Sequence, residues 1–236
     1  MTMRFKFDAL PLILAASFIL PACAGKKAAP VTYPSISADS ERLQESLFKG
    51  DQAVLSNQEI ERILGGHITV ADRHRLAVLG LNSGNYWSQS IADADEQNSE
   101  RFLQALKSSP QLTQVRFVPS LLIPEKRTIP YLREAAARFQ ADLLLIYTTR
   151  IQTFRQDRLL GTDEVRARCV GESVLLDVRT GIVAHTAKAT ESISIKRTSA
   201  DLNFSETVAK AQADAAGKAL VSLATSLTVY LGGLQK

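Results

Sequence analysis

The sequence predicts an α/β (α+β) fold with a single mixed sheet. Three observations support it. Strand and helix patterns alternate as strand-helix-strand-helix-strand over residues 75–147, three long strands without intervening helices follow, and an apolar helix comes last. Crossover helices join parallel strands, whereas strands joined by short turns form an antiparallel β-meander. We therefore expect a mixed sheet with the long C-terminal helix packed on it.

The first predicted helix begins at Ser56-Asn57-Gln58-Glu59, which has the pattern of a capping box. Apolar residues at 60, 63 and 64 share one helical face, and Gly65-Gly66 ends the helix. A glycine pair also occurs in phosphate-binding loops. Neither GxxxxGK[ST] nor GxGxxG surrounds this pair, so it indicates a helix end.

The first strand and helix of the alternating region follow. Residues 75–81 form a short apolar run that predicts a buried strand. Behind the acidic residues Asp93, Asp95 and Glu96, apolar residues recur at helical spacing until Pro110, so we expect the acids at the helix N-terminus, where the dipole favours them.

The second half of the alternating region repeats the pattern. Residues 114–119 alternate as a strand that a proline ends, and residues 129–140 place apolar side chains on one helical stripe. The helix leads directly into residues 142–147, the most apolar strand of the sequence.

Three long strands are predicted at residues 143–155, 164–178 and 182–196. The last two are joined by Arg179-Thr180-Gly181, where the glycine allows a positive φ. In the middle strand the apolar positions change from odd to even numbers. This change predicts a β-bulge at residues 171–173.

A helix over residues 205–231 is the last predicted element. Its apolar residues at 208, 215, 219, 223, 227 and 230 trace one stripe. We expect this helix to pack on the sheet rather than to bind lipid.

The composition indicates a globular protein. Of the 236 residues, 45% are hydrophobic and 22% charged, which excludes collagen-like and disordered chains. Two cysteines cannot form a disulfide-rich scaffold, so stability must come from a packed core. The only long apolar run lies at the N-terminus, and the mean hydropathy of the chain is near zero. These two observations exclude a polytopic membrane protein.

The N-terminus predicts a secretory signal over residues 1–22. Basic Arg4 and Lys6 precede a 12-residue apolar run over residues 9–20, which is too short to span a bilayer. Leu20-Pro21-Ala22-Cys23 then resembles the bacterial lipobox. By that resemblance, the first three residues direct the signal peptidase and Cys23 becomes the lipid-modified first residue of the mature chain. An ordinary signal peptide with a chance cysteine is the alternative.

Three segments follow from this interpretation. Residues 1–22 are the lipoprotein signal peptide, residues 23–50 carry the lipid and a flexible Pro-punctuated tether, and residues 51–236 form one periplasmic α/β domain. Ala24 stands where an aspartate would retain an enterobacterial lipoprotein in the inner membrane, so by analogy we expect the periplasmic face of the outer membrane. The lipid on Cys23 is the only cofactor expected.

The sequence suggests no catalytic or metal site. His67, Asp72 and His74 match neither HExxH nor CxxC spacing, and no GxSxG nucleophile elbow occurs. Cys169 alternates with arginines on an apolar strand face, so we expect a buried, inert thiol. His185 lies within a strand, where a hydrogen-bonded structural role is the default.

Two features could bind a partner. Tyr86 and Trp87 lie in a polar loop after the first strand, and aromatic residues of this kind anchor interfaces, although Trp87 could equally cover the core. Basic residues also gather in the predicted hairpin, where we expect a solvated surface, with acidic glycans or lipid headgroups as the alternative. The charged residues there are Arg150, Arg155, Arg158, Arg166 and Arg168, against Asp157, Asp163 and Glu164.

Two segments carry a family resemblance: AlaAspLeuLeuLeuIleTyrThrThr at 141–149 and the hairpin at 173–190 with its AspValArgThrGlyIle turn. They resemble the periplasmic α/β domain of the curli-secretion pore lipoprotein, of penicillin-binding-protein activator lipoproteins and of the N-terminal domain of TolB. The whole chain looks most similar to the rhombotarget lipoprotein family of proteobacteria. Gly232-Gly233 departs from that family's sorting tail, because no hydrophobic span and basic end follow.

These features predict a non-catalytic, lipid-anchored binding or assembly module that meets the membrane through its anchor and recognises an envelope protein. The alternative is a subunit of an outer-membrane secretion assembly related to the curli pore, and an envelope hydrolase is the third. No extended amphipathic strand pair with alternating lipid-facing residues, which could be donated to an oligomeric barrel, is evident, and the connection over residues 157–164 is too short and charged. Nucleic acid is not an expected partner, because the basic residues are scattered and the net charge is only +4.

Overall fold

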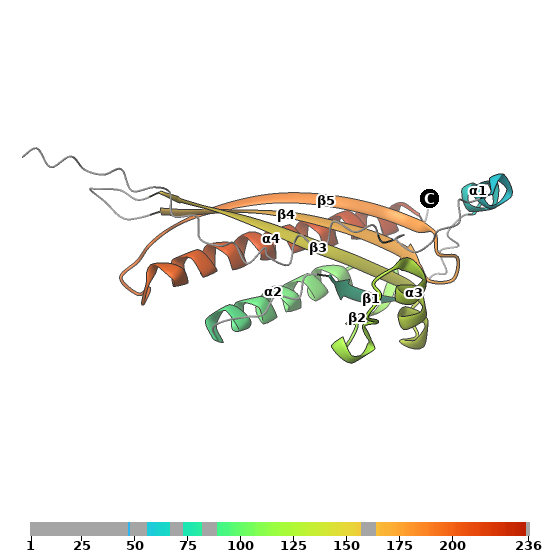
Figure 1. Cartoon of the computed structure of the whole chain (residues 1–236), viewed down its shortest axis with the longest axis horizontal. Coiled ribbons are helices and arrows are strands. Elements are labelled where there is room, and N and C mark those ends of the chain that lie inside the picture. The colour runs from blue at the N-terminus through green and yellow to red at the C-terminus, as the bar shows by residue number, and fades with distance from the viewer. Residues whose placement is uncertain (1–46, 48–55, 67–72, 82–88, 157–163, 235–236) are drawn as a thin grey trace, which may run out of the picture. The chain divides into compact units, whose positions relative to one another are not determined.

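The protein forms one mixed five-stranded sheet with the strand order β2-β1-β3-β4-β5 (Figure 1). The structure, a computed structural model, describes residue 47 and residues 56–66, 73–81, 89–156 and 164–234. Strand β1 pairs in parallel with β2 and β3, and β3, β4 and β5 pair antiparallel. This confirms the predicted mixed sheet. The strands are β1 (His74–Gly80), β2 (Leu112–Phe117), β3 (Leu143–Gln156), β4 (Glu164–Asp177) and β5 (Val183–Lys196).

Helices connect the parallel strands and close the fold. Helix α2 (Gln89–Lys107) leads from β1 to β2, and α3 (Ile129–Arg138) leads from β2 to β3 after the short 3₁₀ turn Ser120–Leu122. Helix α4 (Phe204–Gly233) follows β5. The predicted order of elements is confirmed throughout this region, with ends that differ by a few residues.

Helix α1 (Asn57–Leu64) is capped as the sequence predicts. The Glu59 amide donates to Ser56 Oγ at 3.3 Å, and the Ser56 amide donates to Glu59 Oε2 at 2.9 Å. Gly65 is the C-cap residue, and its amide donates to carbonyls of the last turn. The glycine pair therefore ends a helix.

The predicted start of α2 is wrong. The helix begins at Gln89, ahead of the acidic residues at 93–96, and no acidic residue lies in its first turn. Helix propensity and the packing of the later turns extend the helix backward, so the acids lie within it and not at its dipole end.

One end of the sheet is covered on both faces, and we call it the base. Residues Leu143–Ile146 at the start of β3 are all at most 2% exposed. Leu143 and Leu145 belong to the core under α2 and α4, whereas Leu144 and Ile146 pack with Leu132 and Ala136 of α3. The alternation of a strand thus sends neighbouring leucines into two cores.

The predicted bulge at residues 171–173 is wrong. Strand β4 pairs with β3 without a register shift, and its odd residues from Val165 to Leu175 remain on the α4 side. The even apolar residue Leu176 is buried because it enters the second core, under α3. Coverage of both faces at the base therefore produced the apparent change of face. The register shift lies instead at Leu175/Leu176, where β5 carries Ala184 as its extra residue.

The turn between β4 and β5 agrees with the prediction. Gly181 has a φ of 78°, which favours glycine. Asp177 Oδ1 accepts the amides of Arg179 and Thr180 at 2.7 and 3.0 Å. Arg133 of α3 donates to the carbonyls of residues 178 and 179, which ties the turn to the helix.

Helix α4 lies along the three long strands (Figure 1). Its 30 residues are long and apolar enough to cross a bilayer, yet 44% of its most apolar window is buried. Small residues Ala211, Ala215 and Ala219 pack on Ala167 and Cys169 of β4. Leucines of the later turns pack on the base and on α2. The prediction that this helix packs on the sheet is confirmed.

Candidate functional site

The long strands leave one broad surface without a covering element in the described part of the chain. This surface, which we call the open face, is the side of β3, β4 and β5 opposite α4. Four cross-strand rows compose it, and none of its residues is buried. The rows are Thr148–Glu172–Lys188, Arg150–Val170–Thr190, Gln152–Arg168–Ser192 and Phe154–Arg166–Ser194.

Three guanidinium groups dominate the open face. Arg166 and Arg168 alternate with the buried residues of β4, so both point to the same side, and Arg150 lies on the neighbouring strand. All three are exposed, and none hydrogen-bonds or ion-pairs with a described residue. By contrast, Lys188 forms an ion pair with Glu172 across the strands at 3.1 Å. The face is therefore basic, with its arginines available to a partner.

An exposed aromatic side chain lies beside these arginines. Phe154 is 57% exposed and is the cross-strand neighbour of Arg166. Guanidinium groups bind carboxylates through two parallel hydrogen bonds, and aromatic and arginine side chains are enriched at the energetic centres of protein interfaces. The open face thus combines the two kinds of side chain that such centres use.

Arg155 does not belong to this surface. It lies opposite Val165, on the α4 side, and its guanidinium stacks on the ring of Phe204 at 4.0 Å from the centroid. The arginines of the predicted hairpin therefore divide between two faces. Arg158, Asp157 and Asp163 lie outside the described residues.

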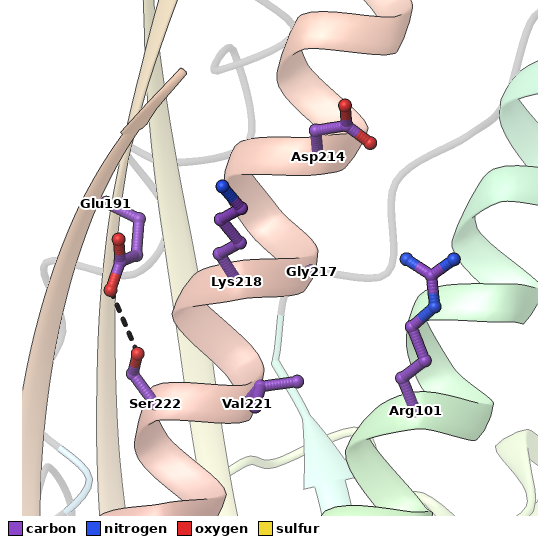
Figure 2. Close-up of a pocket in the computed structure, with 7 residues that line it drawn as sticks. All are labelled: Arg101, Glu191, Asp214, Gly217, Lys218, Val221 and Ser222. Atoms are coloured by element: carbon purple, nitrogen blue, oxygen red, sulfur yellow. Dashed lines mark hydrogen bonds between the residues drawn. The ribbon is translucent and has the colours of Figure 1, made fainter.

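A shallow hollow of about 410 Å³ lies along α4, between α2 and β5 (Figure 2). Its lining carries charges of both signs. Ser222 Oγ donates to Glu191 Oε1 at 2.9 Å, so this hydroxyl faces a carboxylate rather than a histidine base. The arrangement fits a solvated surface depression better than an acyl-transfer centre. The lining residues are Arg101, Glu191, Asp214, Gly217, Lys218, Val221 and Ser222.

The floor of the hollow depends on Gly217. A Cβ atom at this position would clash with Oδ1 of Asn98 in α2. Asn98 is 5% exposed, and its Nδ2 donates to the carbonyl of Ala213 at 2.8 Å. The hollow therefore results from the close approach of α2 and α4.

Two sequence predictions about single residues agree with the structure. Cys169 is fully buried, and burial raises the pKa of its thiol to about 11, so it stays protonated and inert. His185 Nε2 lies 3.1 Å from Ser226 Oγ, and its ring stacks on Tyr230 at 4.6 Å between centroids. Burial lowers the pKa of His185, which favours a neutral structural imidazole.

Most residues of the predicted sites lie outside the described residues. They are Leu20, Pro21, Ala22, Cys23, His67, Asp72, Tyr86 and Trp87. His74 is described and is 5% exposed at the start of β1, where its amide donates to the Gln111 carbonyl at 2.7 Å. Among the residues that the structure describes, no three His, Cys, Asp or Glu side chains gather as a metal ion would need.

Sequence reasoning treated the open-face arginines as a solvated hairpin. The signal that could have singled them out is the alternation of Arg166 and Arg168 with apolar residues, which places both on one side of a strand. The exposure of that side cannot be read from the alternation, because it depends on where the fold places the helices relative to the sheet.

The comparisons with known proteins give a set of partial structural likenesses. No protein-family model matches the chain, and no curated protein matches it either. Similar solved structures include the PelC dodecamer from Paraburkholderia phytofirmans, at 15% identity over 68% of this chain and 89% of that one, with a TM-score of 0.34.

Two lipoproteins are also similar to the chain. The minor lipoprotein from Acinetobacter baumannii shares 13% identity over 68% of this chain and 92% of its own, with a TM-score of 0.33. Lipoprotein GNA1162 from Neisseria meningitidis shares 13% identity over 57% and 90%, with a TM-score of 0.28. At these scores neither a family nor a function follows, and the rhombotarget resemblance stays a prediction.

Proposed function

We propose that this chain is a lipid-anchored, non-catalytic binding module of the bacterial cell envelope that docks an acidic partner protein on its open face. The observation that carries the proposal is a group of three arginines that form no hydrogen bond or ion pair with a described residue. They lie beside an exposed phenylalanine, on a sheet surface that no described element covers.

The anchor rests on the sequence. Leu20-Pro21-Ala22-Cys23 follows a signal-like apolar run, and lipidation of Cys23 would hold the domain at the periplasmic face of the outer membrane. The residues that follow Cys23 up to residue 50 are composed as a flexible tether, so the domain can reach a partner near the membrane while it stays attached.

The chemistry of the open face favours a protein with exposed carboxylates. The four rows contain four basic side chains and one acidic side chain. Their net positive charge attracts an acidic surface at a distance as well as in contact. Phe154 supplies exposed apolar area that a protein surface with a matching pocket would bury.

The test is site-directed photocrosslinking in a bacterial host that expresses the full chain. A photoreactive phenylalanine analogue at position 154 is expected to capture one discrete acidic protein. Combined Arg166→Glu and Arg168→Glu substitution is expected to abolish that product. Arg101→Glu with Lys107→Glu, on exposed positions of α2, makes the same change of charge and should leave it intact.

Two outcomes would contradict the proposal. Crosslinks to lipid alone would assign the open face to the membrane. An equal loss of the crosslinked product in both double variants would show only an effect of net charge. A Cys23→Ser variant separates the role of the anchor from the role of the open face. It should no longer fractionate with membranes, but after purification it should still crosslink to the purified partner protein.

A subunit of a secretion assembly is the second candidate, and the outer edge of β5, which pairs with no described strand, favours it. Strand β5 pairs only with β4 in the sheet order, so its outer side can receive another subunit. Closed rings held through this edge, seen in electron micrographs of the detergent-extracted protein, would support this candidate. Such rings require head-to-tail contacts, so they would also show that the edge does not pair with its own copy.

A further inference from the structure

The longest unpaired backbone edge of the sheet belongs to β5. This strand has 14 residues, whereas β2 at the opposite edge has 6. No described group hydrogen-bonds the outer side of β5, and its neighbour on the inner side is β4 alone. At about 3.4 Å per residue, the free edge extends for about 45 Å. An edge of this length is a template for a further strand.

The strand carries little of what usually protects an edge. It contains no proline, and its bulge is confined to Ala184 at its beginning. Lys188 and Lys196 lie on the open face, and Glu191 on the α4 side is bound to Ser222. Apart from His185, which contacts Ser226 and Tyr230 of α4, the remainder is small or β-branched.

We propose that β5 pairs antiparallel with β5 of a second copy of this chain, so that two sheets join into one. The contact is symmetric, because the same strand serves both subunits, and it therefore closes as a dimer. The occupant is a second copy because the charges of β5 are arranged to permit self-pairing in its longest registers.

The charge pattern is decisive for the register. In a symmetric antiparallel pair the residue on the two-fold axis, the centre, faces its own copy. A centre at Ala189 or Thr190 gives the longest overlap within Val183–Lys196, and neither register places like charges opposite each other. A centre at Thr190 sets Lys188 against Ser192 and Ala187 against Ile193, a small residue against a large one. Like charges directly opposite destabilise strand pairs.

Neighbouring registers are disfavoured by the same charges. A centre at Lys188 sets this lysine against itself, and a centre at Glu191 sets two glutamates together. A centre at Ser192 sets Lys188 against Lys196. The registers next to the two longest overlaps, with centres at residues 188, 191 and 192, therefore place like charges opposite each other.

Cysteine substitution tests the register in the full, membrane-bound chain. Residues at the two-fold centre face their own copies at a distance that a disulfide can span. Thr190→Cys or Ala189→Cys is therefore expected to give a disulfide-linked dimer under mild oxidation. Ser194→Cys is the control, because it faces residue 186 or 184 in the two registers, and the unsubstituted chain should remain unlinked.

A charge inserted at the centre tests the strength of the contact. Thr190→Lys faces either itself or Lys188, whereas Ser194→Lys faces an uncharged residue in both registers. In detergent micelles, sedimentation should show a dimer for the native chain and for Ser194→Lys, and about tenfold weaker association for Thr190→Lys.

The inference is overturned if the native chain sediments as a monomer, if neither central cysteine forms a dimer, or if Ser194→Cys links equally well. Equal sedimentation of Thr190→Lys and the native chain would overturn it too. Failure of the partner test at Phe154 does not bear on it, because the edge of β5 and the open face are separate features.

Discussion

The base of the sheet and its long-strand end differ in how many faces are covered. At the base, four consecutive residues of β3 are buried, because α2 and α4 cover one face and α3 covers the other. Along Val165–Ser173 of β4, only every second residue is buried, because α4 covers one face alone. A continuous apolar run thus marks burial on both faces, and alternation marks burial on one face alone.

Helix α4 serves both regions with different residues. Over the long strands it presents alanines, which let the helix approach Ala167 and Gly171 closely. Over the base it presents Leu220, Leu227 and Leu231, which fill the space beside α2. The two halves of one helix therefore obtain their stability in different ways, from close approach in one and from buried apolar area in the other.

Two phenylalanines give the largest contrast between the regions. Phe102 in α2 is fully buried and contacts the rings of Phe117 and Tyr147, whereas Phe154 on the open face is 57% exposed. Phe102→Ala is expected to lower the free energy of unfolding by about 3–5 kcal/mol. Phe154→Ala should change it by less than about 0.5 kcal/mol. Chemical denaturation measures both, and similar losses would remove the distinction.

The close approach of α2 and α4 can be tested at a glycine. Gly217→Ala is expected to cost about 1–3 kcal/mol, because the new methyl group meets Asn98, whose amide already bonds a carbonyl. Gly232→Ala in the same helix has no atom within 4 Å, so its helix propensity should make it neutral or slightly stabilising. Thermal unfolding of the pair gives the measurement. A neutral Gly217→Ala would mean that the helices are further apart.

The junction between β5 and α4 predicts a pH dependence. Lys210 lies 2.6 Å from Asp201 Oδ1, and this contact, with hydrogen bonds from Thr198 and Thr207, holds the pKa of Asp201 well below its usual range. A carboxyl with a lowered folded pKa stabilises the protein above its unfolded pKa of about 3.9. That contribution is lost as the pH falls further toward the folded value.

Asp201→Asn tests this contribution. The substitution should lower the Tm at pH 7 and should make the loss of stability below pH 4 shallower than in the native chain. Asp214→Asn, at an exposed position of α4, is the control. Parallel pH profiles for Asp201→Asn and the native chain would argue against the assignment.

The smallest expected effect is on the open face itself. Combined Arg166→Glu and Arg168→Glu substitution removes no hydrogen bond or ion pair with a described residue, so the free energy of unfolding should change by less than about 1 kcal/mol. Denaturation of the purified variant checks this. A large destabilisation would show that the arginines serve the fold rather than a partner.

The sequence predicted the elements better than it predicted their coverage. Local signals were sufficient for the capping box at Ser56, for the turn at Gly181 and for the stripe of α4, because neighbouring residues determine them. The bulge was misplaced because the second core, under α3, forms from residues far apart in the chain. Alternation alone cannot distinguish a bulge from burial on both faces.

The candidate site was predicted only in part. The alternation in β4 places Arg166 and Arg168 together, but their exposure depends on the sheet order, which puts α3 at the base and leaves the long strands bare on that side. The aromatic anchor expected at Trp87 lies outside the described residues, and Phe154 is identified only by its exposure in the structure.

Cys169 is buried in the seam where α4 packs on the sheet, so the reactivity of its thiol reports the opening of that seam. Alkylating reagents attack the thiolate, and they can reach the sulfur only when the alanines of the helix lift away from β4. The labelling rate of the unmodified protein therefore reports how often the seam opens, without any inserted probe. A second subunit on β5 or a partner on the open face should slow that rate if it steadies the strands beneath.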